Sequence, residues 1–154
     1  MLPFRRFAQI TGGDRLKKVV ATGTFDILHP GHVYYLNESK KLGEELHVIV
    51  ARDLNVKHKP APVIPEEQRL ILVSELKPVD HARLGDHEDM FRPIEEIDPD
   101  IITLGFNQHF DEEKLKAELS RRGLRAEVVR IGPYDFPLAS SRKIMGEIIK
   151  MRCP

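Results

Sequence analysis

Short apolar stretches alternate with longer amphipathic stretches along this chain of 154 residues. Four of the apolar stretches are nearly continuous, at 18–23 (KVVATG), 45–51 (ELHVIVA), 100–105 (DIITLG) and 126–132 (AEVVRIG), and 79–85 (VDHARLG) is a weaker fifth. Runs of this length that are apolar throughout, rather than at every second residue, are typical of strands buried on both faces. The pattern therefore predicts five buried strands.

The amphipathic stretches predict five helices, at 32–43, 65–76, 89–97, 111–123 and 140–151. A proline and two glutamates suit the start of the second helix, and Gly43 and Gly123 are the expected stop signals of the first and fourth. Strands that alternate with helices indicate an α/β fold, in which a central five-stranded parallel sheet is covered on both faces. Ligands bind such sheets at the carboxyl ends of the strands, so each loop after a strand is a candidate site.

Charge and length narrow the class of protein. Lysine and arginine number 24, as do aspartate and glutamate, so broad nucleic-acid binding, which needs many cationic contacts with phosphate, is not expected. The longest apolar stretches have the length of strands, so no membrane span is expected. The single cysteine, Cys153, excludes an internal disulfide, and no array of cysteine and histidine suggests a metal ion held by the protein.

The length suits one domain, which we place at residues 18–154. Residues 1–17 contain basic side chains but not the apolar core of a secretory signal. We therefore expect residues 1–17 to be an N-terminal extension and the protein to be cytoplasmic.

The loop after the first strand has an unusual composition, GTFDILHPGH at residues 23–32. Pro30 and Gly31 suit the first turn of a helix, where an amide without a partner is tolerated, and Gly31 lets a ligand approach the backbone closely. Two histidines three residues apart, His29 and His32, face the same way if both lie in that turn. Together with the positive end of the helix dipole they form a site suited to a phosphate group.

GTFDILHPGH resembles the HxGH signature of the nucleotidylyltransferase superfamily. Members of that superfamily catalyse attack by a phosphate or carboxylate on the α-phosphorus of a nucleoside triphosphate and release pyrophosphate. The resemblance implies a Rossmann-like three-layer sandwich, in agreement with the predicted elements. It also implies that Thr24, Phe25, His29 and His32 contact the nucleotide, with both histidines catalytic.

The segment ASSRKI at 139–144 resembles a second motif of the superfamily, in which serines and a basic residue at a helix N-terminus bind the β- and γ-phosphates. Ser140 or Ser141 can cap that helix, and Arg142 adds a cationic group. The resemblance implies that Ser140, Ser141 and Arg142 bind ATP, and that Arg142 stabilises the leaving pyrophosphate.

LGFNQ at 104–108 resembles the GxDQ segment that borders the nucleotide in the superfamily, with Asn107 in place of the acid. Asn107 is therefore expected to contact ATP. Other polar residues in the loops after the first two strands are candidates for binding the phosphates or the acceptor. They are Asp26, Arg52, Lys57 and Lys59. For Asp26 a role in loop structure is the alternative, and for Arg52 an ion pair with Asp53.

Over residues 18–150 the chain most resembles the archaeal-type FAD synthases, through VIVARDLNVK, IPEEQRL, ELKPVD and PDIITLG. The resemblance implies transfer of AMP from ATP to FMN by direct in-line attack, with Mg²⁺ or another divalent cation and without a covalent enzyme intermediate. It also implies a homodimer. Glycerol-3-phosphate cytidylyltransferases, which use CTP, share nearly all of these motifs and are the alternative. A nucleotide-binding regulator without turnover is the alternative that is not an enzyme.

Overall fold

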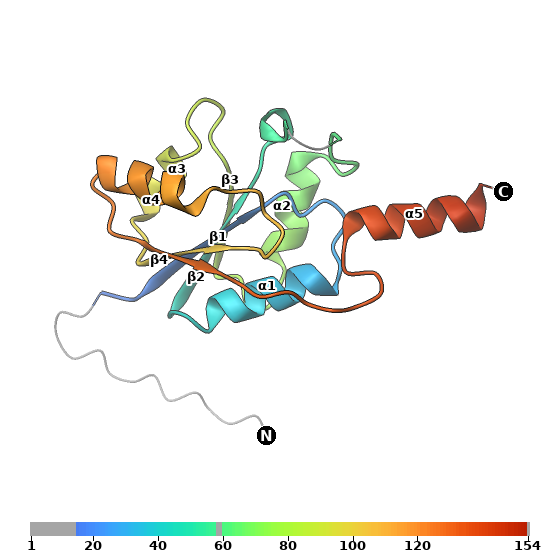
Figure 1. Ribbon diagram of the computed structural model, residues 1–154, viewed down its shortest axis with the longest axis horizontal. Helices are drawn as coiled ribbons and strands as arrows, with labels where there is room; N and C mark the ends of the chain where they lie inside the picture. The colour runs from blue at the N-terminus through green and yellow to red at the C-terminus, as the bar shows by residue number, and fades with distance from the viewer. Residues whose placement is uncertain (1–14, 58–59, 154) are drawn as a thin grey trace, which may run out of the picture.

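The computed structural model describes residues 15–57 and 60–153. Its strands form an all-parallel sheet in the order β3-β2-β1-β4-β5 (Figure 1). The strands are β1 (Lys18–Gly23), β2 (Glu45–Val50), β3 (His81–Leu84), β4 (Ile101–Leu104) and β5 (Glu127–Arg130). All five lie within the predicted ranges, and the prediction of an α/β fold with a five-stranded parallel sheet is confirmed.

The five predicted helices are also present, with ends that differ by a few residues. They are α1 (Pro30–Lys40), α2 (Glu66–Ser74), α3 (Arg92–Ile97), α4 (Glu112–Arg121) and α5 (Ser141–Arg152), and a short 3₁₀ helix, η1, covers Asp53–Asn55. Pro30 takes the first position of α1 because that position needs no amide donor. None of the helices in residues 15–57 and 60–153 is long and apolar enough to cross a bilayer.

Two apolar clusters lie on opposite faces of the sheet. On one face, Tyr35 and Leu36 of α1 and Val73 of α2 pack against alternate residues of β1 and β2. On the other face, Ile94 of α3 and Leu115 of α4 pack against the remaining strand residues. Because helices cover both faces, most residues of β1, β2 and β4 are buried, and the predicted three-layer sandwich is confirmed. The expectation of five buried strands is wrong for β3 and β5, because these strands lie at the edges of the sheet and have no buried residue.

The end of α1 differs from the prediction. The C-cap of α1 is Lys41, whose backbone has right-handed helical φ and ψ angles. The amides of Leu42 and Gly43 then donate to the carbonyl oxygens of Ser39 and Lys40, which forms two further turns before β2. Gly43 is needed for another reason, since a Cβ atom there would lie 2.7 Å from the carbonyl oxygen of Lys17 and 2.8 Å from Cγ2 of Val19. Gly123, in contrast, follows α4 with a φ of +74°, as expected for a glycine that ends a helix.

A buried polar cluster fixes α1 on the sheet. The hydroxyl of Tyr35 donates to the carbonyl oxygen of Thr103 at 2.8 Å, and the hydroxyls of Ser39 and Thr103 lie 2.8 Å apart. Burial raises the pKa of Tyr35 to about 12, so this hydroxyl remains a donor. The cluster therefore holds α1 in place over β4, next to the point where the strand order reverses.

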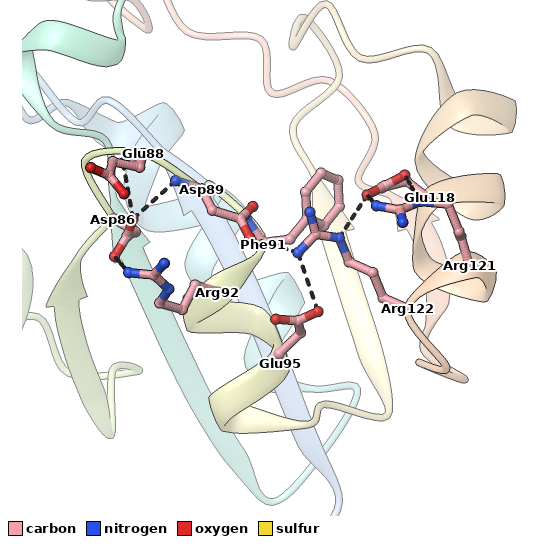
Figure 2. A network of polar contacts seen from close by, with 9 residues as sticks. All are labelled: Asp86, Glu88, Asp89, Phe91, Arg92, Glu95, Glu118, Arg121 and Arg122. Atoms are coloured by element: carbon pink, nitrogen blue, oxygen red, sulfur yellow. Dashed lines mark hydrogen bonds and ion pairs between the residues drawn. The ribbon is translucent and has the colours of Figure 1, made fainter.

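An ion-pair network joins the loop before α3 to the end of α4 (Figure 2). Arg122 donates to Asp89 at 2.7 Å, to Glu95 at 3.2 Å and to Glu118 at 2.6 Å. Its guanidinium also lies 4.8 Å from the ring centroid of Phe91. One side chain thus connects the two helices that cover this face of the sheet.

The last helix lies apart from the layers. Figure 1 shows α5 extending beyond the sheet, after a long connection from β5. None of its described residues is buried, and Ile148, Ile149 and Met151 are 52%, 60% and 71% exposed. The first turn of α5 contacts the β1–α1 loop through Ser141, as described below.

Candidate active site

Two histidines lie at the N-terminus of α1, directly after β1. The rings of His29 and His32 are stacked, with centroids 3.8 Å apart and an interplanar angle of 26°. His29 is the N-cap of α1, and its Nδ1 accepts a hydrogen bond from the amide of Gly31 at 3.1 Å. Because Nδ1 is an acceptor, the neutral ring carries its proton on Nε2. Burial lowers the pKa of His29, which favours this neutral form.

Gly31 has a packing role at the start of α1. A Cβ atom at this position would lie 2.9 Å from both Cε1 and Nδ1 of His29, and 3.1 Å from the carbonyl oxygen of Ala139. The missing side chain therefore makes room for the ring of His29 and for the segment before α5. The close approach of a ligand to this backbone stays a prediction.

The backbone is strained immediately before the histidines. Phe25 has a φ of +53°, which is unusual for a residue other than glycine. Its side chain is 2% exposed and lies 5.2 Å from the ring of His32. The ring of Phe25 lies directly against Gly23. A Cβ atom at position 23 would lie 2.8 Å from this ring, so the glycine leaves the space that the ring occupies. Since the ring belongs to the core, Phe25 can offer a nucleotide only its backbone.

A buried arginine supports the same loop. Arg69 of α2 is fully buried and donates to the carbonyl oxygens of Thr24 at 2.5 Å and Ile64 at 2.9 Å. It also forms an ion pair with Asp53 at 2.6 Å. Sequence analysis missed this residue, although it precedes Val73 by one helical turn and so lies on the apolar face of α2. Arg69 is a positioning residue for the loop that contains Thr24.

The two motifs that resemble phosphate-binding segments meet in the structure. The hydroxyl of Ser141 accepts from the amide of Ile27 and donates to the carbonyl oxygen of Ile27, at 3.1 Å in each case. Ser140 is the N-cap of α5, and its hydroxyl accepts from the amide of Lys143 at 3.1 Å. The exposed side chain of Arg142 lies in the first turn of the helix. The N-termini of α1 and α5 therefore lie next to each other, which favours an anion between them.

The loop after β4 forms the other side of this region. The side-chain amide of Gln108 accepts from the amide of Gly105 at 2.7 Å and donates to the carbonyl oxygen of Thr22 at 2.9 Å. It thereby joins the carboxyl ends of β4 and β1. Asn107, the predicted ATP contact, is exposed beside it. Arg130 of β5 fixes the loop by donating to the carbonyl oxygen of Gly105 at 2.8 Å.

Asp26 has a structural role in this loop. Its two carboxylate oxygens accept from the amides of Val63 and Ile64, at 3.0 and 2.9 Å. This arrangement agrees with the alternative of a role in loop structure. It also joins the β1–α1 loop to the segment before α2.

The partners of Arg52 are Glu66 and Gly85, and not Asp53. It donates to the carbonyl oxygen of Gly85 at 2.6 Å and forms an ion pair with Glu66 at 2.9 Å. The alternative of an ion pair with Asp53 is wrong, because Arg69 is the partner of that carboxylate.

The two candidate lysines follow the 3₁₀ helix η1. Lys57 is exposed at the end of the described part of this loop. Lys59 lies outside the described residues. For both, binding of the phosphates or the acceptor stays a prediction.

A hollow of about 600 Å³ opens beside His29. It is lined by Leu28, His29, Pro30, Val33, Tyr34, Asn37 and Tyr134. Aromatic rings dominate one wall, where Tyr34 and Tyr134 stack with centroids 4.9 Å apart. Tyr134 and Phe136 stack at 4.5 Å with an interplanar angle of only 4°. We call the stack of Tyr34, Tyr134 and Phe136 the aromatic wall. Tyr34 and Tyr134 line the hollow, and Phe136 extends the stack from Tyr134. Flat ligands stack well on aromatic rings.

Comparison with known proteins identifies a family. The family model described as cytidylyltransferase-like matches residues 20–152. The chain is 69% identical over 137 residues to the FAD synthase of Methanoregula boonei, covering 88% of this chain and 93% of that relative. It is 63% identical over 139 residues to the FAD synthase of Methanocella paludicola, covering 90% of this chain and all of that relative.

A solved structure of similar fold comes from Thermoplasma volcanium and bears the name lipopolysaccharide core biosynthesis protein. It is 50% identical to this chain with a TM-score of 0.75, covering 79% of this chain and all of the other. The predicted resemblance to nucleotidylyltransferases, and to the archaeal FAD synthases among them, is confirmed by these matches.

Proposed function

The chain belongs to the cytidylyltransferase-like family, and we propose that it is an FAD synthase, a nucleotidyltransferase that transfers AMP from ATP to the phosphate of FMN and releases pyrophosphate. The observation that carries the proposal is the stacked pair of His29 and His32 at the N-terminus of α1. The bonds between Ser141 and Ile27 hold the N-terminus of α5 beside this pair. Curated relatives with this name match almost the whole length of the chain.

The reaction needs little proton chemistry, because the phosphate of FMN is already an anionic nucleophile at neutral pH. Its oxygen attacks the α-phosphorus of ATP, the bond to the bridging oxygen breaks, and pyrophosphate leaves. Charge develops on the oxygens of the transferred group, so fixed donors contribute most of the rate enhancement. In our proposal Nε2 of His29 and the ring of His32 donate to the α-phosphate.

The first turn of α5 holds the leaving group. Its amides and the hydroxyl of Ser140 face the β- and γ-phosphates, and the guanidinium of Arg142 neutralises the charge of pyrophosphate. Thr24, the backbone of Phe25 and Asn107 border the nucleoside. The pair Ser141 and Ile27 keeps the two helix N-termini at a fixed separation, which the in-line geometry requires.

A divalent cation, Mg²⁺ in our proposal, supplies further charge neutralisation on the triphosphate. Asp26, the acid of the β1–α1 loop, already accepts a backbone amide at each of its carboxylate oxygens. We therefore propose that the cation is held mainly by phosphate oxygens and arrives with ATP.

The aromatic wall supports FMN as the acceptor. A hollow of about 600 Å³ that borders His29 has room for a flavin. Tyr34, Tyr134 and Phe136 already stack on one another, and we propose that the isoalloxazine extends this stack at its outer ring face. Glycerol 3-phosphate has no ring to stack, and the matched relatives are named FAD synthase. The CTP-dependent alternative is therefore not favoured. We further propose that the enzyme acts in the cytoplasm as a homodimer.

Release of pyrophosphate in a matrix of substrates tests the proposal. ATP and CTP are each combined with FMN and with glycerol 3-phosphate in the presence of Mg²⁺. Release only with ATP and FMN, together with an equal amount of FAD, is the expected result. Release only with CTP and glycerol 3-phosphate overturns the assignment of the substrates but not that of the reaction type. If the protein binds ATP but releases no pyrophosphate in any combination, it is a regulator and not an enzyme.

A pair of variants tests the role of the histidines in the same assay. His29→Ala is expected to reduce kcat by about 10²–10³-fold, as the loss of one oxyanion donor does. His87→Ala, which alters an exposed histidine in the loop after β3, is the matched control and is expected to retain full activity. Equal activity of the two variants contradicts the catalytic role of His29.

A further inference from the structure

Three side chains that can bind a metal ion converge at the opposite end of the sheet. Glu45 and His47 are two residues apart on β2 and so project from the same face. His81 on the edge strand β3 is the register partner of His47. One ligand atom of each residue lies within 4.8 Å of those of the other two. We propose that Glu45, His47 and His81 form a binding site for a borderline divalent cation of the Zn²⁺ class.

The geometry of the group is already close to that of a ligand set. Nε2 of His47 lies 3.0 Å from Oε2 of Glu45. The rings of His47 and His81 are stacked with centroids 4.5 Å apart and an interplanar angle of 26°. One nitrogen from each ring and one carboxylate oxygen thus lie within 4.8 Å of one another, on side chains that can rotate towards an ion between them. When Nε2 of His47 binds the ion, the single proton of the neutral ring lies on Nδ1.

The cationic side chains near the group, Lys18 and Arg83, have partners other than the carboxylate of Glu45. Lys18, the register partner of Glu45 on β1, donates its ammonium group to the carbonyl oxygen of Ile97 at 3.0 Å. Arg83, two residues beyond His81 on the same face of β3, pairs with Glu96 at 2.6 Å. The positive groups on this face are therefore directed at α3, and the carboxylate of Glu45 is bonded to His47.

The ligand chemistry selects the class of ion. Two imidazoles and one carboxylate suit Zn²⁺ and its neighbours Co²⁺, Ni²⁺ and Cu²⁺, whereas Mg²⁺ and Ca²⁺ prefer sites made of oxygen alone. Glu45 and His47 are partly buried and His81 is exposed, so one side of the group is accessible to solvent. An ion there has three protein ligands and keeps a water molecule in the fourth position.

The position of the group indicates a stabilising role rather than a catalytic one. His47 precedes the end of β2 at Val50 by three residues, or about 10 Å of strand. The catalytic histidines lie beyond that end, so an ion at His47 does not reach the nucleotide. It joins the edge strand β3, of only four residues, to β2. Because it binds the folded chain, it raises the free energy of unfolding.

The competing interpretation is an ordinary hydrogen bond between His47 and Glu45 with a histidine stacked beside it. Titration of the full chain with Zn²⁺ alone, without nucleotide, separates the two. His81→Asn is the test variant, because His81 is exposed and its replacement is compatible with folding. His87→Asn, a change of the same type in the loop after β3, is the matched control.

We expect the wild type and His87→Asn to bind one Zn²⁺ ion that His81→Asn binds at least about tenfold more weakly. Zn²⁺ is expected to raise the Tm of the first two proteins by several degrees and that of His81→Asn much less. Equal binding and equal Tm shifts for all three proteins overturn the proposal. So does a loss of binding in His29→Ala rather than His81→Asn, which assigns the ion to the nucleotide site.

Co²⁺ provides a second readout that does not depend on stability. Imidazole ligands and a low coordination number give Co²⁺ strong visible absorption, which we expect in the wild type and in His87→Asn but not in His81→Asn. An equal excess of Mg²⁺ is expected to leave this absorption unchanged. Displacement of Co²⁺ by Mg²⁺ overturns the assignment of the ion class.

Discussion

The amide of Gly31 donates to Nδ1 of His29 at 3.1 Å, across the first turn of α1. A protonated ring cannot accept at Nδ1, so this bond and burial both favour the neutral imidazole. We predict a pKa of His29 below the ordinary value of about 6.5 in the ligand-free protein. An NMR titration of the ring protons measures it. A pKa of His29 at or above about 6.5 contradicts the prediction.

Adding a methyl group at Gly31 tests the packing of the site. The Cβ atom of Gly31→Ala lies 2.9 Å from the ring of His29, so the ring must move. Because a small displacement of a catalytic group is costly, we expect kcat to fall by about 10²-fold with little change in secondary structure. Gly146→Ala is the control, since nothing lies within 4 Å of a Cβ atom there. It is expected to be stabilising by up to about 1 kcal/mol and fully active.

The hydroxyl of Ser141 joins the two segments that we propose to bind phosphate. Ser141→Ala loses both bonds to Ile27, and we expect the KM for ATP to rise by about tenfold because the N-terminus of α5 is no longer fixed. Ser74→Ala, which removes an exposed hydroxyl from α2, is the matched control. Unchanged kinetics of Ser141→Ala contradict a role for this contact in binding ATP.

The aromatic wall predicts a selective effect on the acceptor. Tyr134→Ser removes the ring that stacks on both Tyr34 and Phe136. Loss of one stacking contact costs about 1–3 kcal/mol, so we expect the KM for FMN to rise by at least about tenfold and the KM for ATP to change little. Tyr134→Phe keeps the ring and is expected to behave like the wild type. An equal rise of both KM values indicates a structural defect instead.

The network around Arg122 predicts stability that is lost in acid. Hydrogen bonds from Arg121 and Arg122 lower the pKa of Glu118 to about 2, and the hydrogen bond from Arg122 lowers that of Asp89. A carboxyl group with a lowered pKa stabilises the fold above its unfolded pKa of about 4 and loses that contribution as the pH falls. Arg122→Gln is therefore expected to reduce stability at pH 7.

Urea unfolding over a range of pH measures this contribution. The difference between the wild type and Arg122→Gln is expected to shrink steadily as the pH is lowered from about 5 to about 2. A difference that stays constant over this range contradicts the role of the carboxylates.

The helices and strands could be predicted from the sequence because each depends on a short, contiguous stretch of residues. A continuous apolar run such as 45–51 indicates a strand buried on both faces, and Gly123 indicates the end of a helix by its freedom to take a positive φ. Gly43 was also expected to mark the end of a helix. Its role is instead to leave space for the carbonyl oxygen of Lys17, which a Cβ atom at position 43 would approach to 2.7 Å. The local sequence does not show that Lys17 lies so close.

Residues of the site were predicted less completely than the elements. The histidines of GTFDILHPGH could be found because their motif is contiguous. Arg69 was not found, because its charge is neutralised by groups from three separate segments. His47 and His81 likewise meet only through the register of two strands, which a single sequence does not specify.

The bond between Ser141 and Ile27 has a consequence for synthesis of the protein, since 114 residues separate its partners. When a ribosome has made residues 1–140, the described strands and the two histidines that we propose as catalytic exist, but the helix of the proposed phosphate site does not. The sheet can form before this contact, because α5 contributes no buried residue to it. Once β5 has paired with β4, only the connection between β5 and α5 has to be ordered before Ser141 reaches Ile27. In our proposal the sheet can therefore be folded before the phosphate site is complete.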